Sequence, residues 1–216
     1  MIFINKPPKL IDCREHGIES GAELFLVEGD SASMAVANLR NAQFQAVLPM
    51  QGKPMNAYKS SPQKVLQNPL FNALHTSIGA GCGASFHVAA ARYQRIILLM
   101  DPDADGIHCG ALMLLFFHRF MPALLQNGNI EMVRPPLGEV HNGATNVTEY
   151  AQTDAQFLAL CAAQKTQQQP LESLKYRGLA GIAANTLQQL CVDPASRKTS
   201  VMSMQDAAMA LEIFGG

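Results

Sequence analysis

Short apolar runs and longer amphipathic segments alternate along the first 135 residues. The amphipathic segments predict helices from Ser31, taken as the N-cap, to about Leu39, then around Pro69–Ile78, and over Gly110–Gln126. The apolar runs predict buried strands at Leu24–Val27, at Phe44–Leu48 (ended by Pro49), at Ile96–Met100 and at Ile130–Val133. Alternation of this kind predicts an α/β fold: a mostly parallel, Rossmann-like sheet with helices on both faces.

The pattern changes after Pro135. Two short strands are expected around Asn142-Gly143, which is a hairpin signal, and a Gln-rich helix over about Thr153–Gln169. Short helices separated by Asp193-Pro194 follow. We therefore expect three parts: an irregular segment over residues 1–22, the α/β domain over 23–135, and a small mixed C-terminal extension over 136–216.

Composition and charge argue against several classes of protein. Lys and Arg number 16 and Asp and Glu number 17, so a nonspecific nucleic-acid coat protein is not expected, although a local basic groove is compatible with these counts. Five widely spaced cysteines without a C-x-x-C pair argue against a zinc site and a disulfide framework. No signal peptide is expected, because the segment Met1–Pro8 is too short and too quickly broken by prolines. No membrane span is expected, since no uncharged apolar stretch reaches roughly 18 residues. These features predict a cytoplasmic protein.

The run Asp101-Pro102-Asp103-Ala104-Asp105-Gly106 follows the predicted strand Ile96–Met100 directly. Three carboxylates on alternate residues repel one another strongly when they are held together at low effective dielectric. They must therefore be partly protonated, be separated by water, or bind a hard divalent cation. The position of the run at the end of a strand favours the cation.

Glu28 ends another predicted strand. Ligand sites in open α/β sheets lie beyond the carboxyl ends of strands. If the two strands are neighbours, Glu28 converges with Asp101, Asp103 and Asp105. Oxygen ligands of this kind suit Mg²⁺, which can stabilise the attacking and leaving oxygens in phosphoryl transfer.

The acidic residues allow two other interpretations. D-x-D-x-D-G also opens a calcium-binding EF-hand loop, but the twelfth loop position here is Leu112 instead of glutamate, and a strand instead of a helix precedes the loop. A solvated acidic turn would explain the run if it stood alone. Glu28 by itself is equally compatible with a surface turn.

A family resemblance joins these residues. Glu28-Gly29-Asp30-Ser31-Ala32, together with Asp101-x-Asp103-x-Asp105-Gly106-x-His108, resembles the TOPRIM domain of type IIA topoisomerases, as found in the B subunits of DNA gyrase and topoisomerase IV. The similarity extends in order over roughly residues 22–216. It includes Leu48–Asn56, Phe116–Pro122, Pro135–Leu137, Tyr176–Leu179 and the segment from Asp193 to Phe214.

The resemblance implies specific roles. A tyrosine from a partner A-type subunit would attack DNA, while Glu28 and Asp101 bind the catalytic magnesium and Glu28 serves as general acid and base for the ribose 3′ oxygen. Asp101 and Asp103 would hold a second magnesium, with support from Asp105. The positions that match DNA-phosphate contacts are Lys53, Asn56, His108 and Arg177.

The chain departs from the family pattern at several positions. Ser33-Met34 stands where two glycines are usual, and Ala180-Gly181 replaces a Gly-Glu pair. Gln51 and Gly110 each replace an arginine. Two lost positive charges near the expected DNA path weaken phosphate binding by about one counterion each.

The resemblance predicts the metal-binding half of a DNA cleavage–religation centre, an isomerase active only with partner chains. DNA and an A-type subunit would be its partners. ATP would act only through a separate ATPase–transducer chain, since nothing here resembles that domain and Met1 lies near where the family's transducer would end, as in a split or broken gene. The alternative is a truncated or diverged non-catalytic module that binds DNA or topoisomerase subunits. A stand-alone TOPRIM nuclease is disfavoured by matches as far as Phe214.

Overall fold

A five-stranded sheet forms the centre of the protein. The structure is a computed structural model that describes Pro7, residues 9–165 and residues 171–215. The strand order is β2-β1-β3-β4-β8; β1 to β4 are parallel and β8 is antiparallel to β4. The strands are β1 (Glu23–Glu28), β2 (Gln45–Met50), β3 (Arg95–Leu99), β4 (Ile130–Val133) and β8 (Thr199–Val201). The predicted α/β fold with a mostly parallel sheet is confirmed.

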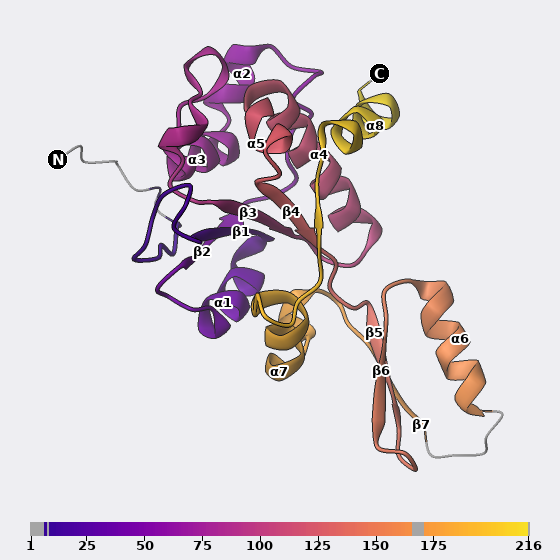
Figure 1. Cartoon of the computed structure of the whole chain (residues 1–216). Coiled ribbons are helices and arrows are strands. Elements are labelled where there is room, and N and C mark those ends of the chain that lie inside the picture. The colour runs from indigo at the N-terminus through magenta and orange to yellow at the C-terminus, as the bar shows by residue number, and fades with distance from the viewer. Residues whose placement is uncertain (1–6, 8, 166–170, 216) are drawn as a thin grey trace.

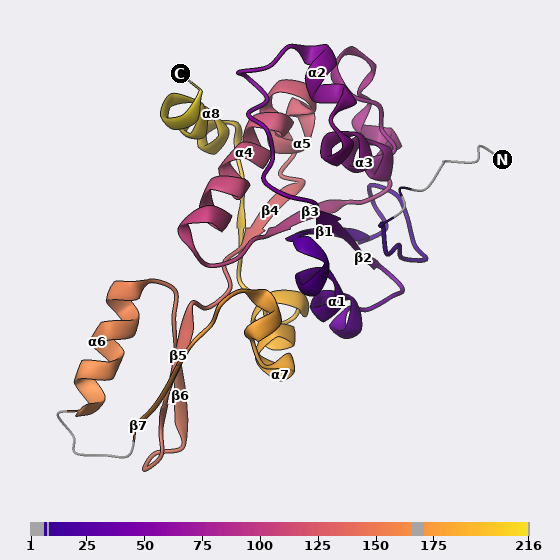
Figure 2. The same cartoon turned by 180° about the vertical axis from the view of Figure 1, so that it is seen from behind.

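Helices cover both faces of this sheet, as Figures 1 and 2 show. One face carries α1 (Gly29–Leu39), α7 (Ala184–Leu187) and the π-helical turn η4 (Gln188–Val192). The other face carries α2 (Pro62–Gln67), α3 (Pro69–Ile78), α4 (Ala104–Phe120), α5 (Pro122–Gln126) and α8 (Met204–Phe214). Short 3₁₀ turns lie at η1 (Gly83–Ser85), η2 (Val88–Ala90) and η3 (Leu179–Gly181).

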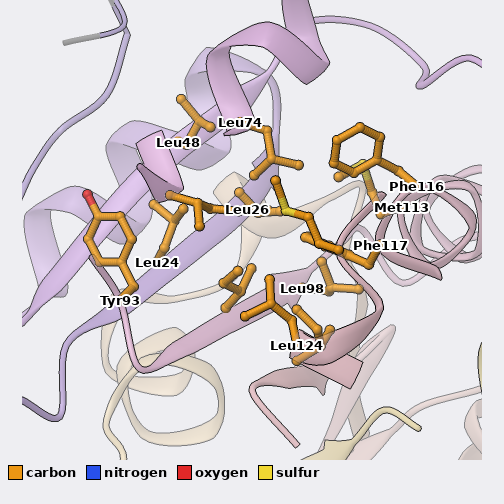
Figure 3. Close-up of a cluster of buried hydrophobic side chains, with 14 of the residues drawn as sticks. Leu24, Leu26, Leu48, Leu74, Tyr93, Leu98, Met113, Phe116, Phe117 and Leu124 are labelled. Atoms are coloured by element: carbon orange, nitrogen blue, oxygen red, sulfur yellow. The ribbon is translucent and has the colours of Figure 1, made fainter. Parts of the chain in front are cut away.

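Successive residues of β1 serve two separate cores, because side chains alternate across a strand. Leu24 and Leu26 belong to the larger core beneath α3 and α4, and Phe25 and Val27 to the core beneath α1 and α7. Figure 3 shows the larger core. There the rings of Phe71 and Phe116 stack with centroids 4.3 Å apart. Burial of each such side chain contributes roughly 1.5–3 kcal/mol to the free energy of folding. The packed core therefore fixes the positions of the strand ends.

The segment after β4 builds a second, smaller sheet that projects from the main body (Figure 1). Its antiparallel order is β6-β5-β7, and α6 packs on it. The elements are β5 (Gly138–Asn142), β6 (Val147–Ala151), α6 (Asp154–Lys165) and β7 (Leu171–Lys175). The hairpin predicted around Asn142-Gly143 is confirmed. The predicted Gln-rich helix is confirmed up to residue 165, and residues 166–169 of that prediction lie outside the described residues.

Three local predictions were wrong. Ser31 is not an N-cap, because α1 already begins at Gly29 with Glu28 at the cap position. Pro49 does not end its strand: β2 is the edge strand of the sheet, where a residue without an N–H leaves no partner unpaired. The helix predicted from Gly110 begins six residues earlier, at Ala104, and breaks at Met121 between α4 and α5.

Three helices or strands were not predicted at all: α2, β7 and β8. Ser61 caps α2 by accepting a hydrogen bond from the Lys64 N–H at 3.3 Å. The strand β8 has only three residues, all exposed, and pairs with β4, which is far from it in sequence. Among the described residues, no helix is long and apolar enough to cross a membrane.

Candidate metal centre

Glu28 and Asp101 lie at the carboxyl edge of the sheet, at the point where successive strands begin to be added on the other side of β1. The strand β1 has β2 on one side and β3 on the other, and Val27 is in register with Leu99. Glu28 is the last residue of β1, and Asp101 follows two residues after Leu99. Such switch points form a crevice between neighbouring loops. The expectation that these two strands are neighbours is confirmed.

Glu28 is the most perturbed carboxyl at this edge. Its Oε1 lies 3.4 Å from the backbone N–H of Asp101, a long hydrogen bond. Burial, followed by the negative charge of Asp101 and of Asp103 and Asp105 beyond it, raises the pKa of Glu28 to about 7. No cation among the described residues forms an ion pair with Glu28, so its carboxyl group lies among other carboxyl groups without a compensating positive charge. A bound divalent ion would relieve this repulsion.

Asp101 is fixed from the C-terminal part of the chain. Its Oδ1 accepts a hydrogen bond from the Leu179 N–H at 2.9 Å. Gly178 makes this approach possible: its φ is +132°, and an added Cβ would lie 2.8 Å from Asp101 Oδ2. Burial raises the pKa of Asp101, the Leu179 N–H lowers it, and the charge of Asp103 raises it further. The second oxygen of Asp101 makes no hydrogen bond within the described residues.

Asp103 starts the helix α4 within the acidic run, so the run is only partly a loop. Its side chain accepts a hydrogen bond from the Gly106 N–H at 2.8 Å and caps α4. Gly106 lets the first turn of the helix fold tightly over Asp101, because an added Cβ would lie 2.1 Å from the Asp101 carbonyl oxygen. Asp103 itself is exposed, so one oxygen remains open to solvent or a ligand.

Asp105 lies in the first turn of α4 and faces Glu28. The ligand atoms of Glu28, Asp105 and Cys109 all lie within 4.8 Å of one another. Burial raises the pKa of the Cys109 thiol to about 12, so it stays protonated and is a poor ligand for a hard cation. Cys109 was not a predicted site residue. Its spacing of four from Asp105 indicates a shared helix face, but only when the helix is known to begin at Ala104.

The predicted DNA-contacting residues have different environments. Lys53 pairs with Asp105, which lowers the pKa of that carboxyl. Asn56 donates to the Phe214 carbonyl at 2.7 Å, and the His108 ring stacks on Phe214 with centroids 4.7 Å apart. Arg177 is exposed beside Gly178, and its side chain has no partner within the described part of the chain. Lys53 thus contacts the acidic edge, whereas Asn56 and His108 both contact Phe214 at the end of α8.

The donors at this edge fit a hard divalent cation. Glu28, Asp101 and Asp103 offer carboxylate oxygens, and the raised pKa values of the first two reflect burial and negative charge without a paired cation in the described chain. Mg²⁺ prefers few carboxylates together with waters and a phosphate. A second acidic group, formed by Asp12, Cys13 and His16, does not fit, because Arg92 already pairs with Asp12 at 2.6 Å.

Comparisons with known proteins show the family to which this chain is related. The Toprim domain model matches residues 23–135. The B subunit of DNA gyrase from Streptococcus pneumoniae serotype 4 is 37% identical over 215 residues, which cover 97% of this chain and 33% of that protein. The gyrase B subunits of Halalkalibacterium halodurans and Archaeoglobus fulgidus are each 35% identical, over 96% of this chain and 32% of their own lengths.

The chain spans about a third of the length of these curated relatives. The matched domain contains Glu28 and the three aspartates of the acidic run, and it accounts for more than half of the chain. The similarity to the gyrase subunits continues through the small sheet and the returning strand β8. The chain therefore belongs to the Toprim family and is a homologue of DNA gyrase B subunits.

Proposed function

We propose that this chain is the metal-binding half of a type IIA topoisomerase centre that cleaves and rejoins DNA. The observation that carries the proposal is the pair Glu28 and Asp101 on adjacent strand ends, with the pKa of Glu28 raised to about 7. Glu28, Asp101 and Asp103 would hold one or two Mg²⁺ ions. When bound, the metal would supply electrostatic stabilisation of charge on the phosphate oxygens.

The chemistry left to the protein is a proton transfer at Glu28. During cleavage, a tyrosine of a partner A-type subunit would lose its phenolic proton to solvent and form a bond from its oxygen to phosphorus, and the bond from phosphorus to the ribose 3′ oxygen would break. Glu28 would give that oxygen a proton, and during rejoining it would take the proton back. In the protein without bound metal, a pKa near 7 makes neither protonation state of Glu28 rare at pH 7, so this side chain is able both to give and to take a proton.

The surrounding residues would position DNA at this edge. Lys53 is exposed in the loop after β2, and Arg177 is exposed directly before the Gly178-Leu179 pair that fixes Asp101. Both cations can contact phosphate without leaving their loops. Strand passage and ATP hydrolysis would need a partner A-type subunit and an ATPase–transducer chain.

The test is reconstitution with an A-type subunit and supercoiled plasmid in Mg²⁺. We expect cleavage products covalently linked to the A-type chain, and their loss in Glu28→Ala and Asp103→Ala. Glu19→Ala is the matched control, because this exposed glutamate precedes β1, at the end of the sheet opposite the acidic edge. Cleavage that persists in Glu28→Ala would overturn the catalytic assignment.

A non-catalytic binding module is the second candidate function. It is favoured by one observation: Phe214 engages both Asn56 and His108, two of the residues that match DNA contacts. Under this alternative the chain binds the A-type subunit and DNA, but the wild-type mixture forms no covalent product in Mg²⁺. The same assay therefore separates the two functions.

A further inference from the structure

A cleft separate from the acidic edge lies between the main sheet and the projecting sheet with α6. Its volume is about 890 Å³. One wall is the end of β4 and the edge strand β8, with Arg134 and Ser200; the other is β6 and α6, with Tyr150 and Gln156. The predicted DNA contacts do not include any of these residues.

The charge of the cleft is one-sided. Arg134 and Lys198 line it, and no Asp or Glu is among the described residues that do. In the described part of the chain, neither cationic side chain has a hydrogen bond or an ion pair, in contrast to Lys53, which pairs with Asp105. Two unpaired cations in one cleft favour an anionic ligand.

The cleft does not include the acidic residues, but it begins at the same end of the main sheet. Val133 is in register with Leu99, so Arg134 stands one residue past β4 at the same carboxyl edge as Asp101. Neighbouring strands are separated by roughly 4.8 Å, and β4 is the strand next to β3. A polyanion that passes the acidic edge therefore meets Arg134 next.

The exposure of the two cations favours a polymer over a small ligand. Arg134 and Lys198 are both exposed, and the neighbouring hydroxyl residues Thr199 and Ser200 are exposed as well. Sites for small anions bury most of the ligand with a few enclosed polar groups. Exposed cations instead bind a nucleic-acid backbone through counterion release.

We propose that this cleft binds the sugar–phosphate backbone of duplex DNA beside the metal centre, with Arg134 and Lys198 each contacting a phosphate. This inference rests on the proposed function, because it extends the same DNA path. The hydroxyls of Ser200 and Thr199 would donate to phosphate oxygens, and α6 would form the outer wall of the path.

The first experiment measures binding of a fluorescent DNA duplex by the full chain in EDTA, so that neither metal nor cleavage is involved. Arg134→Ala/Lys198→Ala should lower the affinity roughly tenfold near 0.1 M salt. It should also reduce the slope of log affinity against log salt by about two, one for each phosphate contact. Arg14→Ala/Lys64→Ala removes two other exposed cations and should change neither quantity as much.

The second experiment locates the DNA. A photo-crosslinking amino acid at Gln156, which lines the cleft, should capture the duplex, whereas the same group at Leu158, which is 67% exposed and does not line the cleft, should not. Equal salt slopes for the two double variants, or capture only at Leu158, would overturn the proposal. So would capture of a nucleoside triphosphate at Gln156 without capture of duplex. Loss of cleavage in Glu28→Ala with intact binding here would leave this proposal standing, so the two can fail separately.

Discussion

The strand β1 begins and ends with a glutamate, and the protein treats the two oppositely. Glu23 at the amino end has no exposed surface and lies among cations, whereas Glu28 at the carboxyl end lies among other acids. Both are glutamates on one strand of six residues. The difference shows which end of the sheet serves stability and which serves chemistry.

At the amino end, the negative charge of Glu23 is compensated by hydrogen bonds and ion pairs. Arg197 contacts it at 2.6 and 2.8 Å, Arg95 at 2.8 Å, and Gln45 donates to it at 2.8 Å. Burial alone would raise the pKa of Glu23, but the hydrogen bonds and charge of Arg197, then Gln45 and Arg95, lower it. A lowered pKa means stability that is present above the ordinary value and is lost as the pH falls.

The largest effect is expected at this amino end. Arg197→Ala leaves the buried Glu23 with Arg95 as its one remaining cationic partner among the described residues, so we expect the free energy of unfolding to fall by about 3 kcal/mol. Urea denaturation followed by circular dichroism measures this. Replacing Glu23 by Gln in the same background should recover part of the loss, because it removes the poorly compensated charge.

The control for this prediction is an exposed pair. Lys175 and Asp154 are 52% and 69% exposed, and Lys175→Ala should cost no more than about 1 kcal/mol. If Arg197→Ala cost as little as Lys175→Ala, the amino end would not be the stabilising end of the sheet.

The next effect is expected at the carboxyl end and has the opposite sign. The pKa of Glu28 is raised from 4.5 to about 7, so the metal-free protein should lose stability as the pH rises through this range. Glu28→Gln should remove that loss and be more stable than wild type at pH 8, by roughly 2 kcal/mol after allowance for solvent. Urea titrations at pH 5 and pH 8 in EDTA test this. Equal pH dependence in both proteins would contradict it.

Binding of Mg²⁺ should also distinguish Glu28 from Glu23. Added Mg²⁺ should raise the melting temperature of wild type at pH 8, and leave that of Glu28→Gln nearly unchanged, if the acidic edge holds the ion. Glu23→Gln offers the matched control, since it changes the other glutamate of the strand and should keep the response to Mg²⁺.

The sequence predicted the carboxyl end better than the amino end. Apolar runs that end in Glu28 and Asp101 are local signals, and adjacency of two parallel strands brings their ends together. Glu23 is held chiefly by Arg197, which is 174 residues away in the sequence. No local pattern connects them, because the contact depends on the chain returning through β8 after the small sheet is complete.

Local details at the site were also beyond the pattern. Aspartate is a weak helix former, so the run Asp101 to Asp105 predicts a loop, yet Asp103 as N-cap starts α4 within the run. The contact of Asp101 with the Leu179 N–H required Gly178 at positive φ, which only the folded chain brings to the acidic edge. The sequence predicted which acidic residues lie at this edge, but it did not predict the hydrogen bonds that hold Asp101 and Asp103 in place.

The smallest effect on stability is expected for Lys53, whose pair with Asp105 is exposed at both ends, 42% and 62%. Lys53→Ala should leave the free energy of unfolding nearly unchanged, because solvent screens an exposed pair. It should nevertheless weaken binding of a DNA duplex severalfold and lower the salt slope by about one, because one phosphate contact is lost. Anisotropy titrations at several salt concentrations measure both, with Lys64→Ala as the control for an exposed lysine without an ion pair in the described chain. The prediction would be contradicted if Lys53→Ala lost as much stability as Arg197→Ala and still bound DNA as wild type does. Lys53 would then be a structural residue, and the carboxyl end of the sheet would serve stability as the amino end does.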